Sequence, residues 1–313
     1  MPETSLENRL DQITYLLIRL NQAQGKVDTA MQLSAKVLIN QMKQQGIYDK
    51  LQDAEFKVYS QFGDDGILQY LIHTIGIPQH LRTFVEFGVE NYLESNTRFL
   101  LYNDNWSGLV MDGSPENVQF ISQDILRWRH ELTAVCAFID KDNINKLITD
   151  NGYSGEIGIL SVDIDGNDYW VWDAIDCVDP IILITEYNST FGWEKAITVP
   201  YDPLFMRYKK HHSGVYFGCS VTAFVKRAEA KGYAFVGCNS QGNNAYFVRK
   251  DKVGSLPVLT AEQGYVQAKF RECMDPQGRL NYMSFEQRRE IIGDMPVIDL
   301  DTNQQTTVRD AVQ

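Results

Sequence analysis

The stretch "TFVEFGVENYLESNT", residues 83–97, decides the fold class of this chain. Its first seven residues are mostly apolar, and a short apolar run of this kind is typical of a strand buried on both faces. Gly88 follows the run, and a glycine there lets the backbone turn tightly and approach a ligand closely. Residues 94–104 then have the pattern of a helix, so this stretch predicts strand, turn and covering helix.

The same alternation continues through the middle of the chain. Strands are predicted at residues 83–89, 107–113, 132–139, 156–165, 180–188, 234–240 and 244–250. Helices are predicted at residues 64–77, 94–104, 114–125, 142–152, 166–176 and 220–233. Apolar strands alternating with helices indicate a parallel sheet covered on both faces. We therefore expect an α/β fold with a mostly parallel seven-stranded sheet, closed by an antiparallel hairpin.

Three regions are expected along the chain: a helical extension (1–50), the α/β domain (51–253) and a C-terminal helical appendage (254–313). The extension carries a heptad seam of apolar residues, interrupted only at Gln24 and Ser34. The seam consists of Leu6, Leu10, Ile13, Leu17, Leu20, Val27, Met31 and Leu38. Two interpretations stay open, a helix packed on its own domain and a helix that forms a homo-oligomer. In the appendage, weaker helices are expected near 260–273 and 284–292.

Composition narrows the class of protein. A formal net charge of -12 over 313 residues argues against broad nucleic-acid binding. No apolar run approaches the roughly 18 residues of a membrane span, and the N-terminus lacks the pattern of a signal peptide. Five cysteines without CxxC spacing are typical of reduced thiols, so a cytoplasmic location is expected.

Polar residues follow the predicted strands at their carboxyl ends, where parallel sheets bind ligands. Asp112 ends the second strand, and an acid there suits the two hydroxyls of a ribose. Capping of the next helix is the alternative role, but Ser114 already fills it. A dinucleotide motif would need glycines at 90 and 93, where Glu90 and Leu93 stand.

These residues resemble the S-adenosylmethionine-dependent methyltransferases with a Rossmann-like class I fold, and most closely the FkbM-like and related glycan-modifying group. The resemblance covers about residues 57–250, and a second glycine common in methyltransferases is replaced by Glu90. It is carried by "YSQFGDDGIL" (59–68), "FVEFG" (84–88), "SNTRFLL" (95–101), "NWSGLVMDGS" (105–114), "LSVDIDGNDYWVW" (160–172) and "EYNSTFG" (186–192).

The resemblance implies a set of residues that bind S-adenosylmethionine. Glu86, Gly88 and Asn91 would line the methionine half of the cofactor. Asp112, with Ser114 beside it, would hold the ribose, and Asp140 would lie near the adenine. Ser60 and Gln61 would cover the site from the preceding loop. Helix capping is the alternative role for Ser60 and Asp140.

The stretch "SVDIDGNDYWVWDAI", Ser161 to Ile175, crowds Asp163, Asp165 and Asp168 after an apolar strand. The positions of these acids do not match those of the ligands in an EF-hand calcium loop. The phosphatase motif DxDG normally follows the first core strand, whereas this stretch follows the fourth. With Glu186 and Asn188 on the next strand, the oxygen ligands suit a hard cation such as Mg²⁺. We predict a metal site at Asp163, Glu186 and Asn188, with presence and absence of the metal both open. Asp165 is a further candidate for metal or base, and Asp168 favours the helix dipole.

The long segment 189–219 is rich in aromatic and cationic residues. Aromatic rings can form faces for sugars, and the cations suit a phosphorylated or nucleotide-linked sugar, with a solvated surface as the alternative. The candidate substrate residues are Trp193, Tyr201, Arg207, Tyr208 and Lys210. The candidate general bases are His211, His212 and Asp165, and Asp168 is an alternative to Asp165 in that role.

The function expected from residues and resemblance is an O-methyltransferase acting on a sugar hydroxyl of a glycan or of a nucleotide- or phospho-sugar precursor. Two alternatives stay open. One is an NAD-dependent nucleotide-sugar oxidoreductase, which the missing glycines disfavour. The other is a non-catalytic subunit that assembles through residues 6–38.

Overall fold

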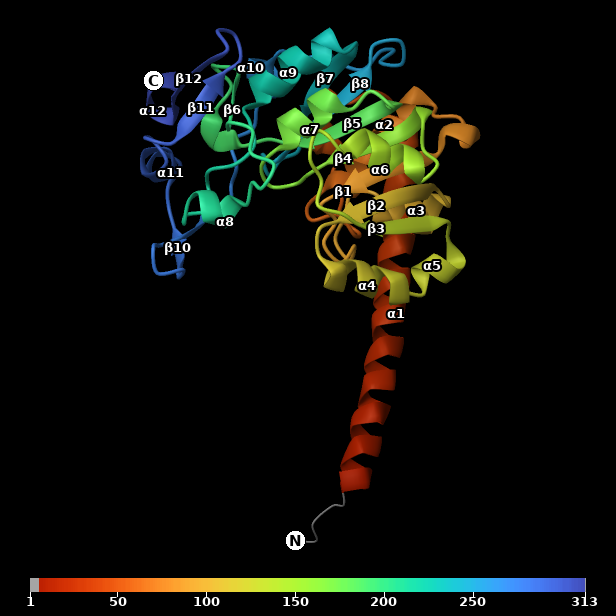
Figure 1. Ribbon diagram of the computed structural model, residues 1–313. Coiled ribbons are helices and arrows are strands. Elements are labelled where there is room, and N and C mark those ends of the chain that lie inside the picture. Colours follow the sequence, from red (N-terminus) through yellow and green to blue (C-terminus); the bar gives the residue numbers. More distant parts are fainter. Residues whose placement is uncertain (1–5, 313) are drawn as a thin grey trace. The chain divides into compact units, whose positions relative to one another are not determined.

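The computed structural model describes residues 6–312 (Figure 1). The chain divides into two compact units, Met1–Gln45 and Gly46–Gln313. The described part of the first unit is a single helix, α1 (Leu6–Gln45), which continues through Gly25 without a break. The predicted N-terminal helix is therefore confirmed. No helix within residues 6–312 combines the length and apolarity needed to cross a membrane.

The second unit is built on a seven-stranded sheet in the order β3-β2-β1-β4-β5-β8-β7. The strands are β1 (Thr83–Phe87), β2 (Ser107–Asp112), β3 (Leu132–Cys136), β4 (Gly155–Val162), β5 (Val178–Glu186), β7 (Tyr233–Cys238) and β8 (Asn244–Arg249). β1 to β5 run parallel, and β8 is antiparallel to both β5 and β7. This order, with its antiparallel closing pair, is the class I methyltransferase fold, so the predicted fold class is confirmed.

Helices pack beside this sheet and bury its apolar side chains. They are α2 (Asp64–Ile75), α3 (Arg98–Asp104), α4 (Pro115–Gln123), α5 (Leu126–Arg129), α6 (Ile144–Asp150), α7 (Asp168–Ala174) and α9 (Val221–Ala230). Val85, Leu160 and Leu183, on three adjacent strands, are fully buried in one core cluster. Ser114 caps the N-terminus of α4, because its Oγ accepts a hydrogen bond from the Asn117 N–H, as the Ser-Pro pattern predicts.

Among the elements that are shorter than predicted, β4 and α3 lie beside the site. β4 ends at Val162 because Asp165 adopts a left-handed backbone with φ +57, which a strand cannot contain. α3 begins at Arg98 because the N–H groups of Asn96 and Thr97 bind the Glu86 carboxylate instead of continuing a helix.

The C-terminal residues pack against segment 189–219, which contains η3 (Ser189–Phe191), β6 (Ile197–Thr198) and α8 (Arg207–Lys210). β6 and β12 pair with β11, and these strands cover a second core cluster. The C-terminal elements are α10 (Ala261–Gly264), β9 (Glu272–Met274), β10 (Leu280–Tyr282), α11 (Phe285–Ile291), β11 (Pro296–Asp299), β12 (Gln304–Thr307) and α12 (Val308–Ala311).

Of the helix expected near 260–273, only α10 is helical. The residues after it are held extended, since Tyr187 Oη donates to the Val266 carbonyl and the Ala268 N–H donates to Ser189 Oγ. Two short 3₁₀ helices, η1 (Leu51–Ala54) and η2 (Gln79–Leu81), complete the second unit. All five cysteines are free thiols.

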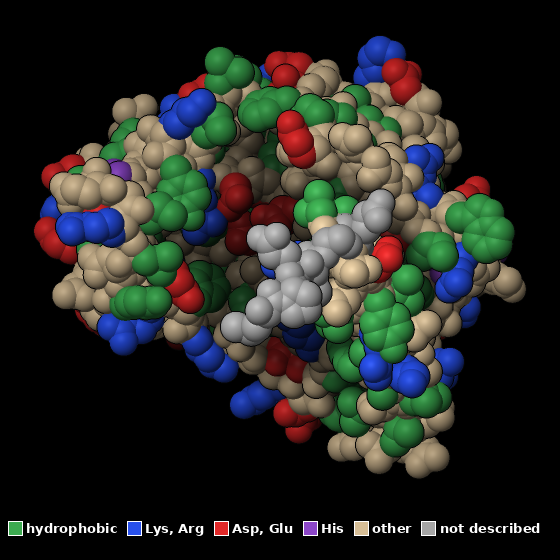
Figure 2. All heavy atoms as spheres, turned by 90° about the horizontal axis from the view of Figure 1, so that it is seen from below, with side chains coloured by type: hydrophobic (Ala, Val, Ile, Leu, Met, Phe, Trp, Pro, Cys, Tyr) green, Lys and Arg blue, Asp and Glu red, His purple; other side chains and the backbone are tan. Residues whose placement is uncertain are grey.

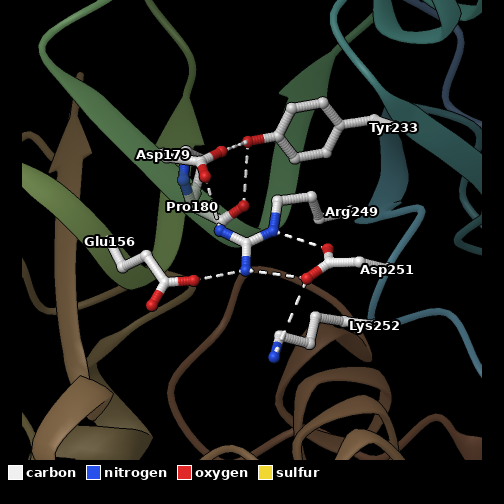
Figure 3. Close-up of polar contacts among 7 residues, drawn as sticks. All are labelled: Glu156, Asp179, Pro180, Tyr233, Arg249, Asp251 and Lys252. Carbon is white, nitrogen blue, oxygen red and sulfur yellow. Dashed lines mark hydrogen bonds and ion pairs between the residues drawn. The ribbon is translucent and has the colours of Figure 1, made fainter.

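An arginine joins the amino ends of the parallel strands to the closing hairpin (Figure 3). Arg249, at the end of β8, binds Glu156 on β4, Asp179 on β5 at 2.5 Å and Asp251 at 2.7 Å. Tyr233 on β7 donates to Asp179 at 3.0 Å. This network lies at the amino ends of β4 and β5, the opposite end of those strands from Asp163 and Glu186.

Candidate functional site

A cavity of about 550 Å³ lies at the carboxyl ends of the parallel strands. It is lined by residues at or just after the ends of β1 to β5, by part of segment 189–219 and by the turn before β8. Figure 2 shows acidic side chains, in red, recessed within a hollow of the molecule. The cavity is where a class I sheet offers room for a ligand.

Gly88 is required by close packing at the end of β1. Its φ is +74, and a Cβ atom there would lie 1.6 Å from the Asp163 carbonyl oxygen. The Gly88 N–H donates to the Met111 carbonyl at 3.0 Å, so the turn is held between β2 and the end of β4. The glycine thus brings the β1 turn and the acid-rich β4 turn together on the cavity wall.

Glu86 lies on the cavity wall and anchors the turn before α3. Its carboxylate accepts hydrogen bonds from Ser95 Oγ at 3.0 Å, from the Asn96 N–H at 2.9 Å and from Thr97 Oγ1 at 2.5 Å. Burial raises the pKa of Glu86, and these donors act in the opposite direction. The residue therefore shapes the turn that faces the cavity.

Asp112 lines the cavity at the end of β2. Its Oδ1 accepts from the Ser114 N–H at 2.8 Å and from Asn117 Nδ2 at 3.0 Å, and its Oδ2 accepts from the Glu90 N–H at 2.8 Å. Glu90, also on the wall, has φ +49, so a side chain occupies a left-handed position where many methyltransferases have glycine. Ser114 and Asn91 lie outside the cavity lining.

The loop before α2 places Gln61 on the cavity wall but not Ser60. Ser60 Oγ donates to Asp65 Oδ2 at 2.9 Å, and that oxygen also accepts the N–H groups of Val58, Tyr59 and Ser60. Burial raises the pKa of Asp65 to about 6. Ser60 is therefore part of a buried turn around Asp65, which holds the loop carrying Gln61.

Asp140 caps the turn that leads into α6. Its Oδ1 accepts from the Asp142 and Asn143 N–H groups, both at 2.8 Å. The cavity wall at this corner is made instead by Ala137, Phe138 and Ile139. Asp140, predicted to lie near the adenine, is therefore not on the cavity wall, and the residues before it are.

Three carboxylates converge on the cavity from adjacent strand ends. Asp163, Asp165 and Glu186 each offer an oxygen, and these atoms all lie within 4.8 Å of one another. Burial and the neighbouring acids raise the pKa of Asp163 and of Glu186. Glu186 Oε2 is a buried acceptor without a hydrogen-bond partner. An oxygen-only donor set, in which one residue has a buried oxygen without a partner, fits a hard divalent cation.

Asn188 does not join this cluster. Its Nδ2 donates to the Val215 carbonyl at 2.8 Å and to the Phe217 carbonyl at 3.0 Å, and its Oδ1 accepts the Thr190 N–H at 3.0 Å. The amide is buried and used entirely to hold segment 189–219 on the end of β5. Its position in the sequence is next to the site, but its side chain is structural.

Asp168 holds the acid-rich turn in shape. Its Oδ1 accepts the Ile164 N–H at 2.7 Å, and its Oδ2 accepts the Gly166 N–H at 2.8 Å. Burial raises the pKa of Asp168 to about 6. The three aspartates therefore divide into two that face the cavity and one that fixes the loop presenting them.

Arg207 is the cation of the cavity wall. Its Nη1 lies 2.6 Å from Asp165 Oδ1, its Nε donates to the Gly214 carbonyl, and its guanidinium stacks 3.9 Å from the Phe217 ring centroid. Tyr208 also lines the cavity, whereas Lys210 lies outside the lining and pairs with Asp202 at 2.5 Å. α8 thus contributes one charged and one aromatic side chain to the site.

The remaining candidates in segment 189–219 lie outside the cavity lining. His211 Nδ1 is 2.7 Å from Ser213 Oγ, its ring centroid is 4.3 Å from that of His212, and burial lowers the pKa of His211. Tyr201 contacts the Trp170 ring edge-on. Trp193 is partly buried against the main core cluster.

Several lining residues are not among the candidate site residues named from the sequence. They include Asn96, Phe138, Asn167, Phe205, Asn243 and Asn244. Phe205 approaches because Gly166 leaves room, since a Cβ at Gly166 would lie 2.1 Å from the ring. Asn244 Nδ2 donates to Asp64 Oδ1 at 3.0 Å, which ties the closing hairpin to α2. Asn96 and Asn167 lie within the motifs "SNTRFLL" and "LSVDIDGNDYWVW", which could have indicated these two residues.

Comparisons with known proteins give fold likeness only. No family model and no curated protein matches the chain. A putative caffeoyl-CoA O-methyltransferase from Staphylococcus aureus aligns at 15% identity over 75% of this chain and 98% of that one, with TM-score 0.38. An O-methyltransferase from Bacillus cereus in complex with SAH aligns at 13% identity over 59% and 78%, with TM-score 0.37.

A putative O-methyltransferase from Klebsiella pneumoniae aligns at 10% identity over 67% of this chain and 87% of that one, with TM-score 0.38. Likeness at this level carries no argument about substrate or residues. The class I fold is therefore assigned on the strand order and the antiparallel closing pair.

Proposed function

We propose that this chain is an S-adenosylmethionine-dependent O-methyltransferase that acts on a sugar hydroxyl, assisted by a divalent cation. One observation carries the proposal: on a class I sheet, a single cavity joins Asp112 at the end of β2 to the carboxylates of Asp163, Asp165 and Glu186. The first feature suits a nucleoside, and the second suits an acceptor whose hydroxyl must lose a proton.

The cofactor half of the proposal rests on the β1 and β2 turns. The Asp112 carboxylate can accept hydrogen bonds from ribose hydroxyls, and Phe138 and Ile139 offer an apolar face to the adenine. The turn anchored by Glu86 would hold the methionine end. Acidic side chains around the cavity favour a ligand with a positively charged sulfonium and ammonium.

In the proposed reaction the acceptor oxygen attacks the methyl carbon in line with the carbon–sulfur bond. The carbon–oxygen bond forms as the carbon–sulfur bond breaks, and the sulfonium leaves as a neutral thioether. The acceptor proton passes to the acid cluster, where Asp165 is the only one of the candidate bases that lines the cavity. The enzyme otherwise supplies alignment.

Asp163 and Glu186 would hold the divalent cation, which lowers the pKa of a bound hydroxyl when present, and Asp165 beside them would accept the proton. Arg207 positions Asp165 through its 2.6 Å ion pair.

The charge of the wall favours a neutral acceptor over a phosphorylated one. Arg207 is the one cation among the described lining residues, and it is already paired with Asp165. The acids on the wall are Glu86, Glu90, Glu94, Asp112, Asp163, Asp165 and Glu186. No cationic side chain among the described lining residues is therefore left unpaired to bind a phosphate, so a neutral glycan fits better than a nucleotide- or phospho-sugar.

The experiment is transfer of a tritiated methyl group from S-adenosylmethionine to a panel of neutral oligosaccharides and matched sugar phosphates, with Mg²⁺ or EDTA. We expect labelling of neutral acceptors, and a loss of about 100-fold or more in kcat for Asp165→Asn. His212→Gln, which alters a candidate base outside the cavity, is the matched control and should retain activity. Labelling restricted to sugar phosphates, or equal activity of the Asp165 variant, would refute these assignments.

A further inference from the structure

We propose that α1 pairs with α1 of a second copy of this chain as a parallel, in-register coiled coil. The inference concerns the first unit and is independent of the proposed methyl transfer. In heptad register the a positions are Leu10, Leu17, Gln24, Met31 and Leu38, and the d positions are Leu6, Ile13, Leu20, Val27 and Ser34. Eight of these ten residues are apolar, and none is charged.

The seam is exposed along most of its length. Leu6 is 75% exposed, Leu17 60% and Leu20 67%. Large apolar side chains aligned on one helix face mark an interaction surface, and a helix rarely maintains them in water without a partner. A second copy of the same seam would remove them from water.

The seam is long enough for a specific interface. At about 1.5 Å per residue, the segment from Leu6 to Leu38 spans about 50 Å. With a helix about 10–12 Å wide, such a strip gives about 500–600 Å² on each copy. The total of about 1,000–1,200 Å² reaches the lower range of specific protein interfaces.

The residues beside the seam allow self-pairing. The g positions Leu16, Ala23, Ala30 and Val37 are apolar and widen the contact face, so two or more copies can join. In a parallel pair, each g position faces the e position five residues later in the partner. Arg9 then faces Thr14, and Ala23 faces Asp28, so no like charges meet.

Gln24 selects the parallel arrangement. In a parallel, in-register pair, two Gln24 side chains meet in one layer and can hydrogen-bond to each other. In an antiparallel pair that overlaps the whole seam, Gln24 would face Leu20 and bury its amide against an apolar side chain. The polar interruption of the seam thus specifies orientation and register.

The first test is the mass of the full chain in solution, measured by light scattering after size exclusion. We expect at least twice the monomer mass of 35.8 kDa. Leu17→Asp with Leu20→Asp should give the monomer mass. The matched control, Gln12→Asp with Gln22→Asp, adds the same charges at c and f positions and should retain the oligomer. A monomeric wild-type chain would overturn the proposal. The same holds if the monomer sediments with vesicles of one part phosphatidylglycerol to three parts phosphatidylcholine, because the partner of α1 would then be a membrane surface.

The second test is orientation. Leu10→Cys should form an intermolecular disulfide on mild oxidation, at a level above that of the wild-type chain with its native thiols. A disulfide that forms only when Leu10→Cys is combined with Ser34→Cys would indicate antiparallel pairing and contradict the register. The monomeric variant should still bind S-adenosylhomocysteine, because the cofactor site does not depend on the coiled coil. The coiled coil and the methyltransferase assignment can therefore fail independently.

Discussion

Asp163 and Glu186 stand side by side at the carboxyl ends of two adjacent parallel strands. Val162 of β4 pairs with Thr185 of β5, so the next residue of each strand is an acid at the same level of the sheet. Their carboxylate oxygens lie within 4.8 Å of each other and of Asp165. Burial raises the pKa of both groups, Asp165 and Asp168 raise both further, and Asp163 also raises that of Glu186, which makes the cluster a strong binder of a proton or a cation.

Binding of a divalent cation at this pair should release protons. Because the pKa values of Asp163 and Glu186 are raised, the cation must displace protons that the pair holds, and the affinity should increase with pH. Calorimetric titration with Mg²⁺ or Mn²⁺ in buffers of different ionisation enthalpy measures both effects. Asp163→Asn with Glu186→Gln should abolish the binding, and equal metal affinity of that variant would exclude the site.

Asn188→Ala should reduce stability without acting through the metal. Removing the buried amide leaves the Val215 and Phe217 carbonyls without their donor, at about 1–3 kcal/mol of unfolding free energy. Asn188→Asp keeps the size but loses the donor, so it should be destabilised as well. Denaturant unfolding measures the loss; an unchanged midpoint together with weakened metal binding would instead make Asn188 a ligand.

The contribution of Asp65 to the stability of the folded chain should decrease as pH rises. Its folded pKa is about 6 against 3.8 for the free group, so the folded state binds the proton more tightly. The stabilisation is therefore full below about pH 4 and is lost as pH rises through about 6, by up to about 3 kcal/mol.

The measurement is the unfolding free energy of wild type minus that of Asp65→Asn, followed from pH 4 to 6.5. We expect this difference to fall with pH. A difference that is constant or increases would show that burial does not dominate at Asp65.

Arg249→Met should destabilise the sheet more than Lys250→Met. The change at Arg249 leaves Glu156, Asp179 and Asp251 crowded without their cation, for a loss of about 1–2 kcal/mol that is larger at low salt. The neighbouring Lys250 makes only an exposed pair with Glu229 at 3.9 Å, so its variant is a matched control. Equal melting temperatures for the two variants would contradict the role of the network.

The sheet could be predicted because its signals are local. Apolar runs, Gly88 and the acids at strand ends are properties of short segments, and parallel strands bring their carboxyl ends to one edge. The same reasoning brought Glu86, Asp112, Asp163, Asp165 and Glu186 to the cavity.

What the sequence could not predict depends on contacts between distant residues. Asn188 has the right position for a ligand, but its amide is taken by carbonyls 27 and 29 residues later. Phe205 reaches the cavity because Gly166 leaves room, and β6 pairs with a strand about one hundred residues away. His211 and His212 have suitable chemistry for a base, but the fold of segment 189–219 places them off the cavity wall.

The most direct test of the account is calorimetric titration of the chain with S-adenosylhomocysteine. We expect saturable binding that is weakened about tenfold or more by Asp112→Asn, since a hydrogen bond to a charged group contributes about 1.5–3 kcal/mol. Glu116→Gln removes the same charge in the first turn of α4, outside the cavity lining, and should leave the affinity unchanged. No binding at millimolar ligand, or equal affinity of the wild-type and Asp112→Asn chains, would contradict the cofactor site.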